Sequence, residues 1–198
     1  MDRVAPVRLV GRHVTMEPLG LEHVAGLVAA ATAEGRDSFR WTSVPGDAAA
    51  MRAYVEEALA LDHVPFATVA GGRVVGSTRF GNLERWKRGE DRIDAVEIGW
   101  TWLTPSAQRT VVNTEAKLLM LGHAFESWRV HRVTLKTDAR NARSRAAIER
   151  LGAKLDGLLR AHMPATDDTL RTSAVYSILA GEWPEVRARL IARLEAAT

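Results

Sequence analysis

The chain has 198 residues, of which 46% are hydrophobic and 26% charged, a composition typical of globular proteins. It contains no cysteine, so disulfide bonds, thiolate metal ligands and a cysteine nucleophile are excluded. The net charge is only +3, without the basic stripe and interleaved aromatic residues of a nucleic-acid-binding surface. We therefore expect no nucleic-acid partner.

The chain has no apolar run of about 18 residues, the length that a membrane-spanning helix needs. Its first ten residues also lack the continuous apolar region of a signal peptide. We therefore expect no membrane partner and a cytoplasmic protein. The six histidines show no pair at metal-ligand spacing with a nearby carboxylate, so no metal is expected.

Hydrophobic periodicity and turn residues predict the elements of the first half. Asp47 is placed to cap a helix, and Gly71-Gly72 predicts the turn of a hairpin. In chain order we expect a strand over 7–17, a helix over 21–33, an irregular segment over 34–47, a helix to residue 63, paired strands over 65–70 and 74–80, and a charged connection over 82–92.

Residues 96–103 alternate in a way that predicts a strand. We expect Val96, Ile98, Trp100 and Trp102 on one side, and Glu97, Gly99, Thr101 and Leu103 on the other. Pro105 ends this strand. A short loop over 108–113 then leads to Thr114, the expected N-cap of the next helix, with Glu115 in its first turn.

The second half continues with helical and alternating segments, and Gly152 stands where a helix C-cap favours glycine. The expected elements are a helix over 114–128, a strand over 130–137, a helix over 141–151, antiparallel strands over 155–163 and 172–179, and a helix over 182–194 with Pro184 in its first turn. We therefore predict one α+β domain over 1–198, with a C-terminal helical extension over 182–197.

A loop between a strand and a helix presents unpaired backbone N–H groups, which favour a phosphate. Here the loop over 108–113 has that position, although an ordinary strand-to-helix turn would read the same way. Two motifs carry a family resemblance. They are Glu97-x-Gly99 followed by Pro105, Gln108 and Asn113-Thr114-Glu115-Ala116, and Asn141-x-x-Ser144 followed by Leu151-Gly152.

These motifs resemble the acyl-CoA-binding core of the GNAT acetyltransferases, most closely the RimJ/RimL-type branch, which Arg171 and Tyr176-Ser177 also match. The resemblance implies a twisted, mixed, mostly antiparallel sheet that opens at its centre and is flanked by helices. It implies transfer of an acetyl group from acetyl-CoA, the cosubstrate, to a primary amine of a protein, peptide or small molecule.

The resemblance also implies residue roles. Glu97 is the expected general base, although it could simply be a strand carboxylate facing solvent or an arginine. Ser144 is expected near the thioester, where it would protonate the thiolate or orient a water. Asn141 is expected on the CoA arm unless it only caps its helix. The remaining expected CoA-binding residues are Trp100, Trp102, Leu103, Gln108, Arg109, Thr110, Val111, Val112, Asn113, Thr114 and Arg143, with Arg140 and Arg145 as further phosphate candidates.

The sequence departs from the family pattern at several points. Arg109, Val111 and Asn113 replace small residues, and Val111 fits the loop only with a negative φ. Ile148 stands where many members have a tyrosine acid. A catalytically idle CoA-binding module therefore stays an alternative.

Three aromatic residues in loops, Phe39, Trp41 and Trp86, are the candidates for binding the acceptor. Phe39 and Trp41 could instead pack at the end of the core, and Trp86 could instead lie in a solvated loop. Trp86 and the C-terminal helix would also suit an α+β interaction protein or a homodimer.

Overall fold

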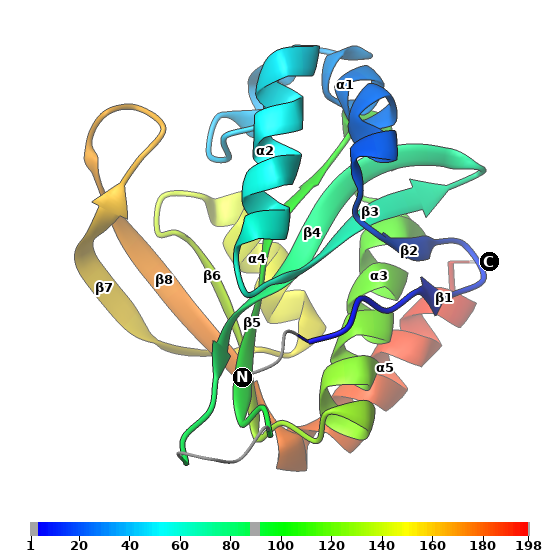
Figure 1. Cartoon of the computed structure of the whole chain (residues 1–198). Helices are drawn as coiled ribbons and strands as arrows, with labels where there is room; N and C mark the ends of the chain where they lie inside the picture. Colours follow the sequence, from blue (N-terminus) through cyan, green and yellow to red (C-terminus); the bar gives the residue numbers. More distant parts are fainter. Residues whose placement is uncertain (1–3, 88–91, 198) are drawn as a thin grey trace.

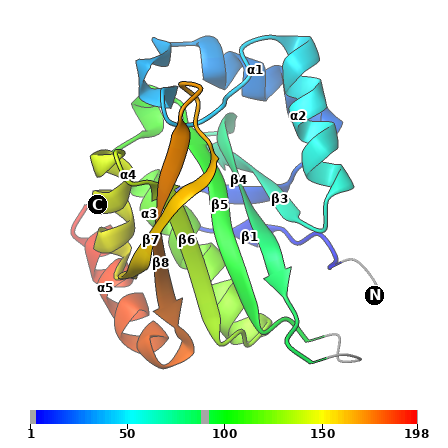
Figure 2. The same cartoon turned by 90° about the vertical axis from the view of Figure 1, so that its left-hand side faces the viewer.

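A computed structural model describes residues 4–87 and 92–197. This part of the chain forms an eight-stranded sheet in the order β1-β2-β3-β4-β5-β6-β8-β7, shown from two sides in Figures 1 and 2. Its strands are β1 (Leu9–Val10), β2 (Thr15–Pro18), β3 (Val64–Ala70), β4 (Arg73–Glu84), β5 (Ala95–Leu103), β6 (Arg132–Asp138), β7 (Lys154–Pro164) and β8 (Leu170–Leu179). Only β5 and β6 pair in parallel, so the predicted mixed, mostly antiparallel sheet is confirmed.

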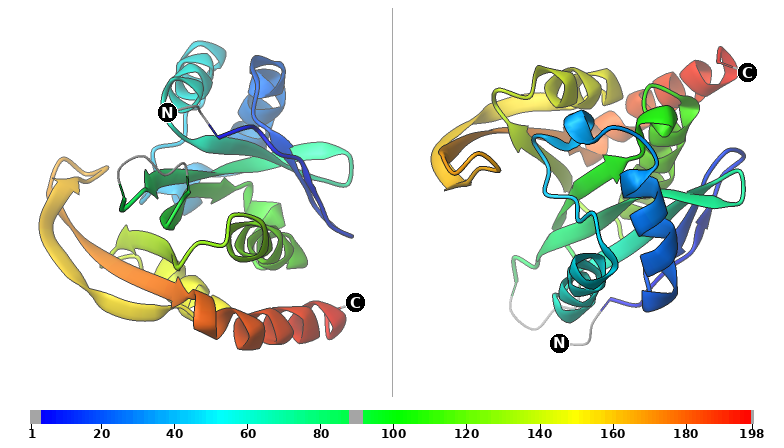
Figure 3. Two further views of the ribbon diagram at one scale, coloured as in Figure 1. Left: turned by 60° about the horizontal axis from the view of Figure 1, so that its bottom comes forward. Right: turned by 90° about the horizontal axis from the view of Figure 1, so that it is seen from above.

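Helices cover both faces of the sheet, as Figure 3 shows. On one face, α1 and α2 enclose a core around Leu27, Met51 and Val55, into which Trp102 of β5 also points. On the other face, α3, α4 and α5 enclose a larger core that includes Leu103. The helices are α1 (Val24–Thr32), α2 (Ala48–Ala60), α3 (Val111–Gly122), α4 (Ala142–Leu151) and α5 (Trp183–Glu195), with 3-10 helices at Leu21–His23, Arg36–Phe39, Pro105–Ala107 and Ala180–Glu182.

The predicted helix start at Asp47, the hairpin turn at Gly71-Gly72 and the helix end at Gly152 are confirmed. The Asp47 carboxylate accepts a hydrogen bond from the Ala50 N–H at 2.9 Å and so begins α2. Gly71 and Gly72 have φ values of 57° and 73° in the β3–β4 turn, and Gly152 has a φ of 101° after α4. These are left-handed conformations that glycine adopts without a steric cost.

The N-terminal strand prediction was wrong, because residues 7–17 form two short strands, β1 and β2, with a turn between them. The cause lies far away in the sequence, since the Glu115 side chain of α3 accepts hydrogen bonds from three backbone N–H groups of this turn. A Cβ at Gly11 would lie 2.5 Å from the carboxyl carbon of Glu115. The turn therefore needs a glycine at this position.

The connection predicted over 82–92 begins later than expected. Asn82 and Leu83 still belong to β4, which ends at Glu84, and residues 88–91 of the predicted hairpin tip lie outside the described residues. Within the described ranges, no helix has the length and apolarity that crossing a membrane would require.

Candidate functional site

The central opening of the sheet lies between β5 and β6. The two strands pair only from Ala95↔Arg132 to Glu97↔Thr134, although β5 continues to Leu103 and β6 to Asp138. Beyond Glu97 their facing edges diverge, which leaves backbone groups of both strands without a partner across the opening. A cavity of about 640 Å³ fills this space, and α3, α4, β7 and β8 complete its walls.

A β-bulge in β5 determines which face of the sheet each side chain after Gly99 lies on. Trp100 has a φ of 52°, and the register with β4 shifts so that Trp100 and Thr101 both stand opposite Thr78. The predicted alternation is therefore wrong after Gly99. Ile98 and Leu103 share the core beneath α3, whereas Trp102 packs under α1 and α2.

Trp100 lies on the α2 side of the sheet, where its ring packs 4.8 Å from that of His63. The side chains of β5 and α3 therefore enter the cavity from both faces of the sheet. Thr101, Asn113 and Lys117 approach from the α3 side, and Glu97, Trp100 and Trp102 approach from the α2 side. Leu103, an expected CoA contact, is instead buried in the core.

Glu97 projects into the cavity and is only 7% exposed. Asn82 donates to its Oε2 at 2.6 Å, and the Lys136 ammonium lies 2.8 Å from the same oxygen. Oε1 lies 3.0 Å from where a Gly99 Cβ would stand, so glycine leaves space beside this oxygen. The carboxylate is therefore held through one oxygen while the other remains available.

The loop after β5 is fixed by its own side chains. Gln108 donates from Nε2 to the Leu103 carbonyl at 2.7 Å, and its Oε1 accepts a hydrogen bond from Arg143 of α4 at 2.9 Å. Arg109 takes a left-handed φ of 62°. The loop thus links the end of β5 to the beginning of α4 across the mouth of the opening.

The N-cap of α3 is Thr110, not Thr114 as predicted. The Thr110 hydroxyl accepts from the Val112 N–H at 3.2 Å, and Val111 is the first helical residue, with a φ outside the left-handed region. Thr114 is buried inside the helix. Apart from the Val112 N–H, the first-turn N–H groups have no intrahelical acceptor, and Asn113 of this turn lines the cavity.

Asn141 and Ser144 line the cavity from the α4 side. The Asn141 Oδ1 accepts from the Ser144 N–H at 3.0 Å, so Asn141 caps α4. Its amide nitrogen has no partner among the described residues. Arg143 also donates to the Ser38 carbonyl at 2.8 Å. Ile148, which stands where many family members have tyrosine, lines the same wall.

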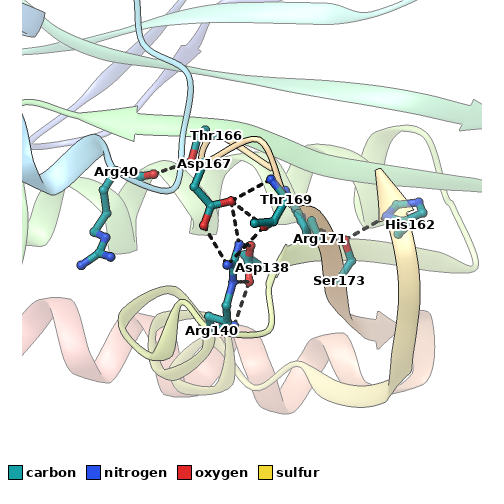
Figure 4. Close-up of polar contacts among 9 residues, drawn as sticks. All are labelled: Arg40, Asp138, Arg140, His162, Thr166, Asp167, Thr169, Arg171 and Ser173. Carbon is teal, nitrogen blue, oxygen red and sulfur yellow. Dashed lines mark hydrogen bonds and ion pairs between the residues drawn. The ribbon is translucent and has the colours of Figure 1, made fainter. Parts of the chain in front are cut away.

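The other two arginines of this segment already have protein partners. Arg140 donates to the carboxylates of Asp138 and Asp167, as Figure 4 shows. Arg145 donates to the hydroxyl of Tyr176 at 2.9 Å, and Tyr176 is fully buried in the core. Arg140 donates through Nε and both terminal nitrogens, so a role at a phosphate would require some of these bonds to break. The bond of Arg145 uses Nε and leaves its terminal nitrogens for a phosphate.

The three aromatic candidates lie in different environments. Trp41 lines the cavity, with the guanidinium carbons of Arg40 and Arg140 each 4.7 Å from its ring centre. Phe39 packs edge-on against Trp102 in the core. Trp86 is 55% exposed and stacks on His131, away from the residues that line the cavity.

Sequence reasoning missed Lys117, whose side chain is only 4% exposed although it lines the cavity. Its ammonium donates to Thr78 at 3.1 Å and to Thr101 at 2.8 Å, and it forms no ion pair with any carboxylate of the described residues. Burial lowers its pKa to about 7. Its spacing of four residues from Asn113 was the available signal, since both then share one helix face.

Lys136, His162 and Arg171 also line the cavity and were not assigned there from the sequence. They come from three strands that meet only in the folded sheet. Among the described residues, no cluster of histidine and acidic side chains could hold a metal ion.

Comparison with known proteins places these features in a family. The sequence profile of the acetyltransferase (GNAT) domain matches residues 13–154. A search among curated protein sequences gives no significant match. GNAT enzymes use acetyl-CoA as the acetyl donor.

Solved structures agree. One from T. thermophilus that carries an acetyltransferase assignment is 36% identical, with a TM-score of 0.85 over 98% of this chain and 100% of that one. A GCN5-related N-acetyltransferase from Brucella melitensis is 26% identical, with a TM-score of 0.88 over 100% and 92%. Mycobacterium smegmatis RimJ in complex with CoA-disulfide shares the fold at 22% identity, with a TM-score of 0.78 over 97% and 94%. The chain belongs to the GNAT family and is an acyl-CoA N-acyltransferase.

Proposed function

We propose that this enzyme binds acetyl-CoA in the opening between β5 and β6 and transfers its acetyl group to a primary amine. The observation that carries the proposal is the end of β5–β6 pairing at Glu97↔Thr134, which leaves an opening that Asn113 of the first turn of α3 also lines. Unpaired strand edges offer hydrogen bonds to the amides of the pantetheine arm. The helix N-terminus favours the negative pyrophosphate through its free N–H groups and its dipole.

The thioester would lie near the bulge in β5. Backbone N–H groups around Gly99 to Trp102 that the ladder with β4 does not use would hydrogen-bond the thioester carbonyl as negative charge develops on its oxygen. Ser144 lies on the opposite wall, where it would give a proton to the departing thiolate. A thiolate is a fair leaving group, so a tyrosine at the position of Ile148 is not essential.

Glu97 is the proposed general base. A charged amine must lose a proton before it attacks, and a carboxylate can accept that proton directly or through one water. Asn82 and Lys136 both hold Oε2, which leaves Oε1 for the incoming amine. The new N–C bond forms as the C–S bond breaks, and the products are an acetylated amine and CoA thiol.

Replacing Glu97 with glutamine tests this assignment. General base catalysis typically contributes 10²–10⁴-fold, so we expect Glu97→Gln to lower kcat/KM by at least about 100-fold. Release of CoA thiol from acetyl-CoA, measured with a panel of primary amines, reports the rate. A thermal-shift titration should give an acetyl-CoA affinity close to that of the wild type, since glutamine preserves the shape of the side chain.

Glu84→Gln is the matched control, because Glu84 lies at the exposed end of β4 and its side-chain partners among the described residues, Arg132 and Trp86, are at the surface. It should retain the wild-type rate. Full activity in Glu97→Gln would remove this residue from the chemistry. Absence of amine-dependent thiol release with every amine would contradict the proposed function itself.

A further inference from the structure

Ser173 of β8 is fully buried and joins two residues of the cavity wall. Arg171 of the same strand lies 2.9 Å from its hydroxyl oxygen through Nε, and His162 of β7 lies 2.9 Å from it through Nδ1. Figure 4 shows this three-residue arrangement beside the Asp138–Arg140–Asp167 cluster. Both Arg171 and His162 line the cavity that contains Glu97.

The protons of this arrangement follow from its chemistry. An arginine Nε can only donate, so the Ser173 oxygen accepts from Arg171 and its own hydrogen is free to donate to His162. Burial, together with the charges of Lys136 and Arg171, lowers the pKa of His162, which favours the neutral ring. A neutral ring that accepts at Nδ1 carries its proton on Nε2. The Nε2–H of His162 is then a donor.

The remaining donors of Arg171 and His162 have no acceptor in the part of the chain that the structure describes. Among the described residues, neither the terminal nitrogens of Arg171 nor Nε2 of His162 forms a hydrogen bond or an ion pair. The nearest acidic groups already have partners, since Asp138 binds Arg140, and Glu97 binds Asn82 and Lys136. Burial lowers the pKa of Arg171, although the charges of Asp138 and Glu97 act in the opposite direction. Such a group gains most from an anionic ligand that enters the cavity.

We infer that Arg171 and His162 form a subsite for a carboxylate, and that the acceptor is an amine that also carries a carboxylate, such as an amino acid. This inference rests on the proposed function. The guanidinium presents its two terminal nitrogens as a planar fork that matches the two oxygens of a carboxylate. A ligand held there would keep its amine in the same cavity as Glu97.

Matched acceptors test the subsite. Glycine, β-alanine and γ-aminobutyrate differ in the distance from amine to carboxylate, and the primary amide of each lacks the negative charge. We expect the wild type to favour at least one acid over its amide in kcat/KM. In Arg171→Gln this acid-to-amide ratio should fall by at least about tenfold, because a bidentate, charge-assisted pair is lost. The acid and amide amines differ in basicity, but this difference affects every variant equally. It therefore cancels when the acid-to-amide ratio is compared between wild type and variant.

Two further variants separate charge and geometry from general damage. Arg171→Lys keeps the charge but not the fork, so its ratio should lie between those of wild type and Arg171→Gln. Arg160→Gln removes an exposed arginine from the same β7–β8 arm and should leave the ratio unchanged. An equal ratio for wild type and Arg171→Gln, or equal loss with acids and amides, would overturn the subsite.

A binding experiment on the wild type keeps the inference testable even if Arg171→Gln does not fold. Calorimetric titration should show tighter binding of the N-acetylated acids than of the matching N-acetylated amides, and equal affinities would again overturn the subsite. Acetylation of amides alone would contradict the carboxylate subsite while leaving the transferase intact. No thiol release with any amine would instead contradict the proposed function.

Discussion

Replacement of Lys117 with methionine is expected to stabilise the folded protein by about 3 to 5 kcal/mol at pH 7. Burial lowers the pKa of the Lys117 ammonium from 10.5 to about 7, and each pKa unit corresponds to about 1.4 kcal/mol. Methionine has a similar length and carries no charge. The Thr78 and Thr101 hydroxyls that bind Lys117 keep each other as partners at 2.7 Å.

The effect should depend on pH with a definite sign. In the unfolded chain Lys117 stays charged up to about pH 10.4, whereas in the folded chain it loses its proton above about pH 7. The unfolded state therefore binds more protons in this interval, and the Lys117 contribution to stability falls as the pH drops from about 10.5 to about 7. Below that it is constant.

Denaturant unfolding of wild type and Lys117→Met between pH 6 and pH 9.5 measures this difference. The advantage of the variant should be largest at pH 6 to 7 and should shrink toward pH 9.5. Lys154→Met is the control, because Lys154 is an exposed lysine that pairs with Glu182, and its removal should not stabilise the protein. If the free energies of unfolding of wild type and Lys117→Met changed with pH in the same way, burial of the Lys117 ammonium would not destabilise the protein.

Replacement of Glu115 with alanine is expected to destabilise the fold by about 3 to 5 kcal/mol. Its buried carboxylate accepts hydrogen bonds from the backbone N–H groups of Arg12, His13 and Val14 at 2.9, 2.6 and 2.8 Å. Hydrogen bonds to a charged group contribute about 1.5 to 3 kcal/mol each. Alanine would also leave three donors without an acceptor, so the β1–β2 turn would detach from α3.

Urea unfolding gives the free energy of unfolding for this series. Glu115→Gln should lose less than alanine, because one amide oxygen can still accept while the amide nitrogen faces donors. Glu56→Ala removes an exposed glutamate that pairs with Arg52 on α2, and it should change stability by less than about 0.5 kcal/mol. A loss in Glu115→Ala as small as that of the control would contradict the anchoring role.

Local patterns in the sequence were sufficient where one residue determines the conformation. Asp47, Gly152 and the Gly71-Gly72 pair mark element ends through a side-chain acceptor or a left-handed φ, and each is confirmed. The family motifs gave the open central sheet. The motif residues Glu97, Asn113, Asn141 and Ser144 all lie around one cavity, although their chemical roles stay predictions.

Errors arose where a distant partner or an irregular backbone overrides the local pattern. The bulge at Trp100 reverses the side-chain alternation in the middle of β5. Hydrophobic periodicity does not predict where a strand contains an extra residue. The cap of α3 moved to Thr110, since Thr114 is equally suited by residue type alone. Lys117, Lys136 and Arg171 lie around the same cavity because α3, β6 and β8 pack together. These elements are far apart in the sequence, so local patterns do not predict that arrangement.

Hydrogen exchange with and without acetyl-CoA tests the central claim, that the opening between β5 and β6 holds the cosubstrate. At saturating acetyl-CoA and short exchange times, amides over 98–103 of β5 and over 109–113 at the start of α3 should exchange more slowly, because the ligand binds those N–H groups that no described residue accepts and shields the others from water. Amides of α5, on the outer layer, should be unchanged at those times. No slowing in either segment at saturation, or protection confined to other parts of the chain, would contradict this placement.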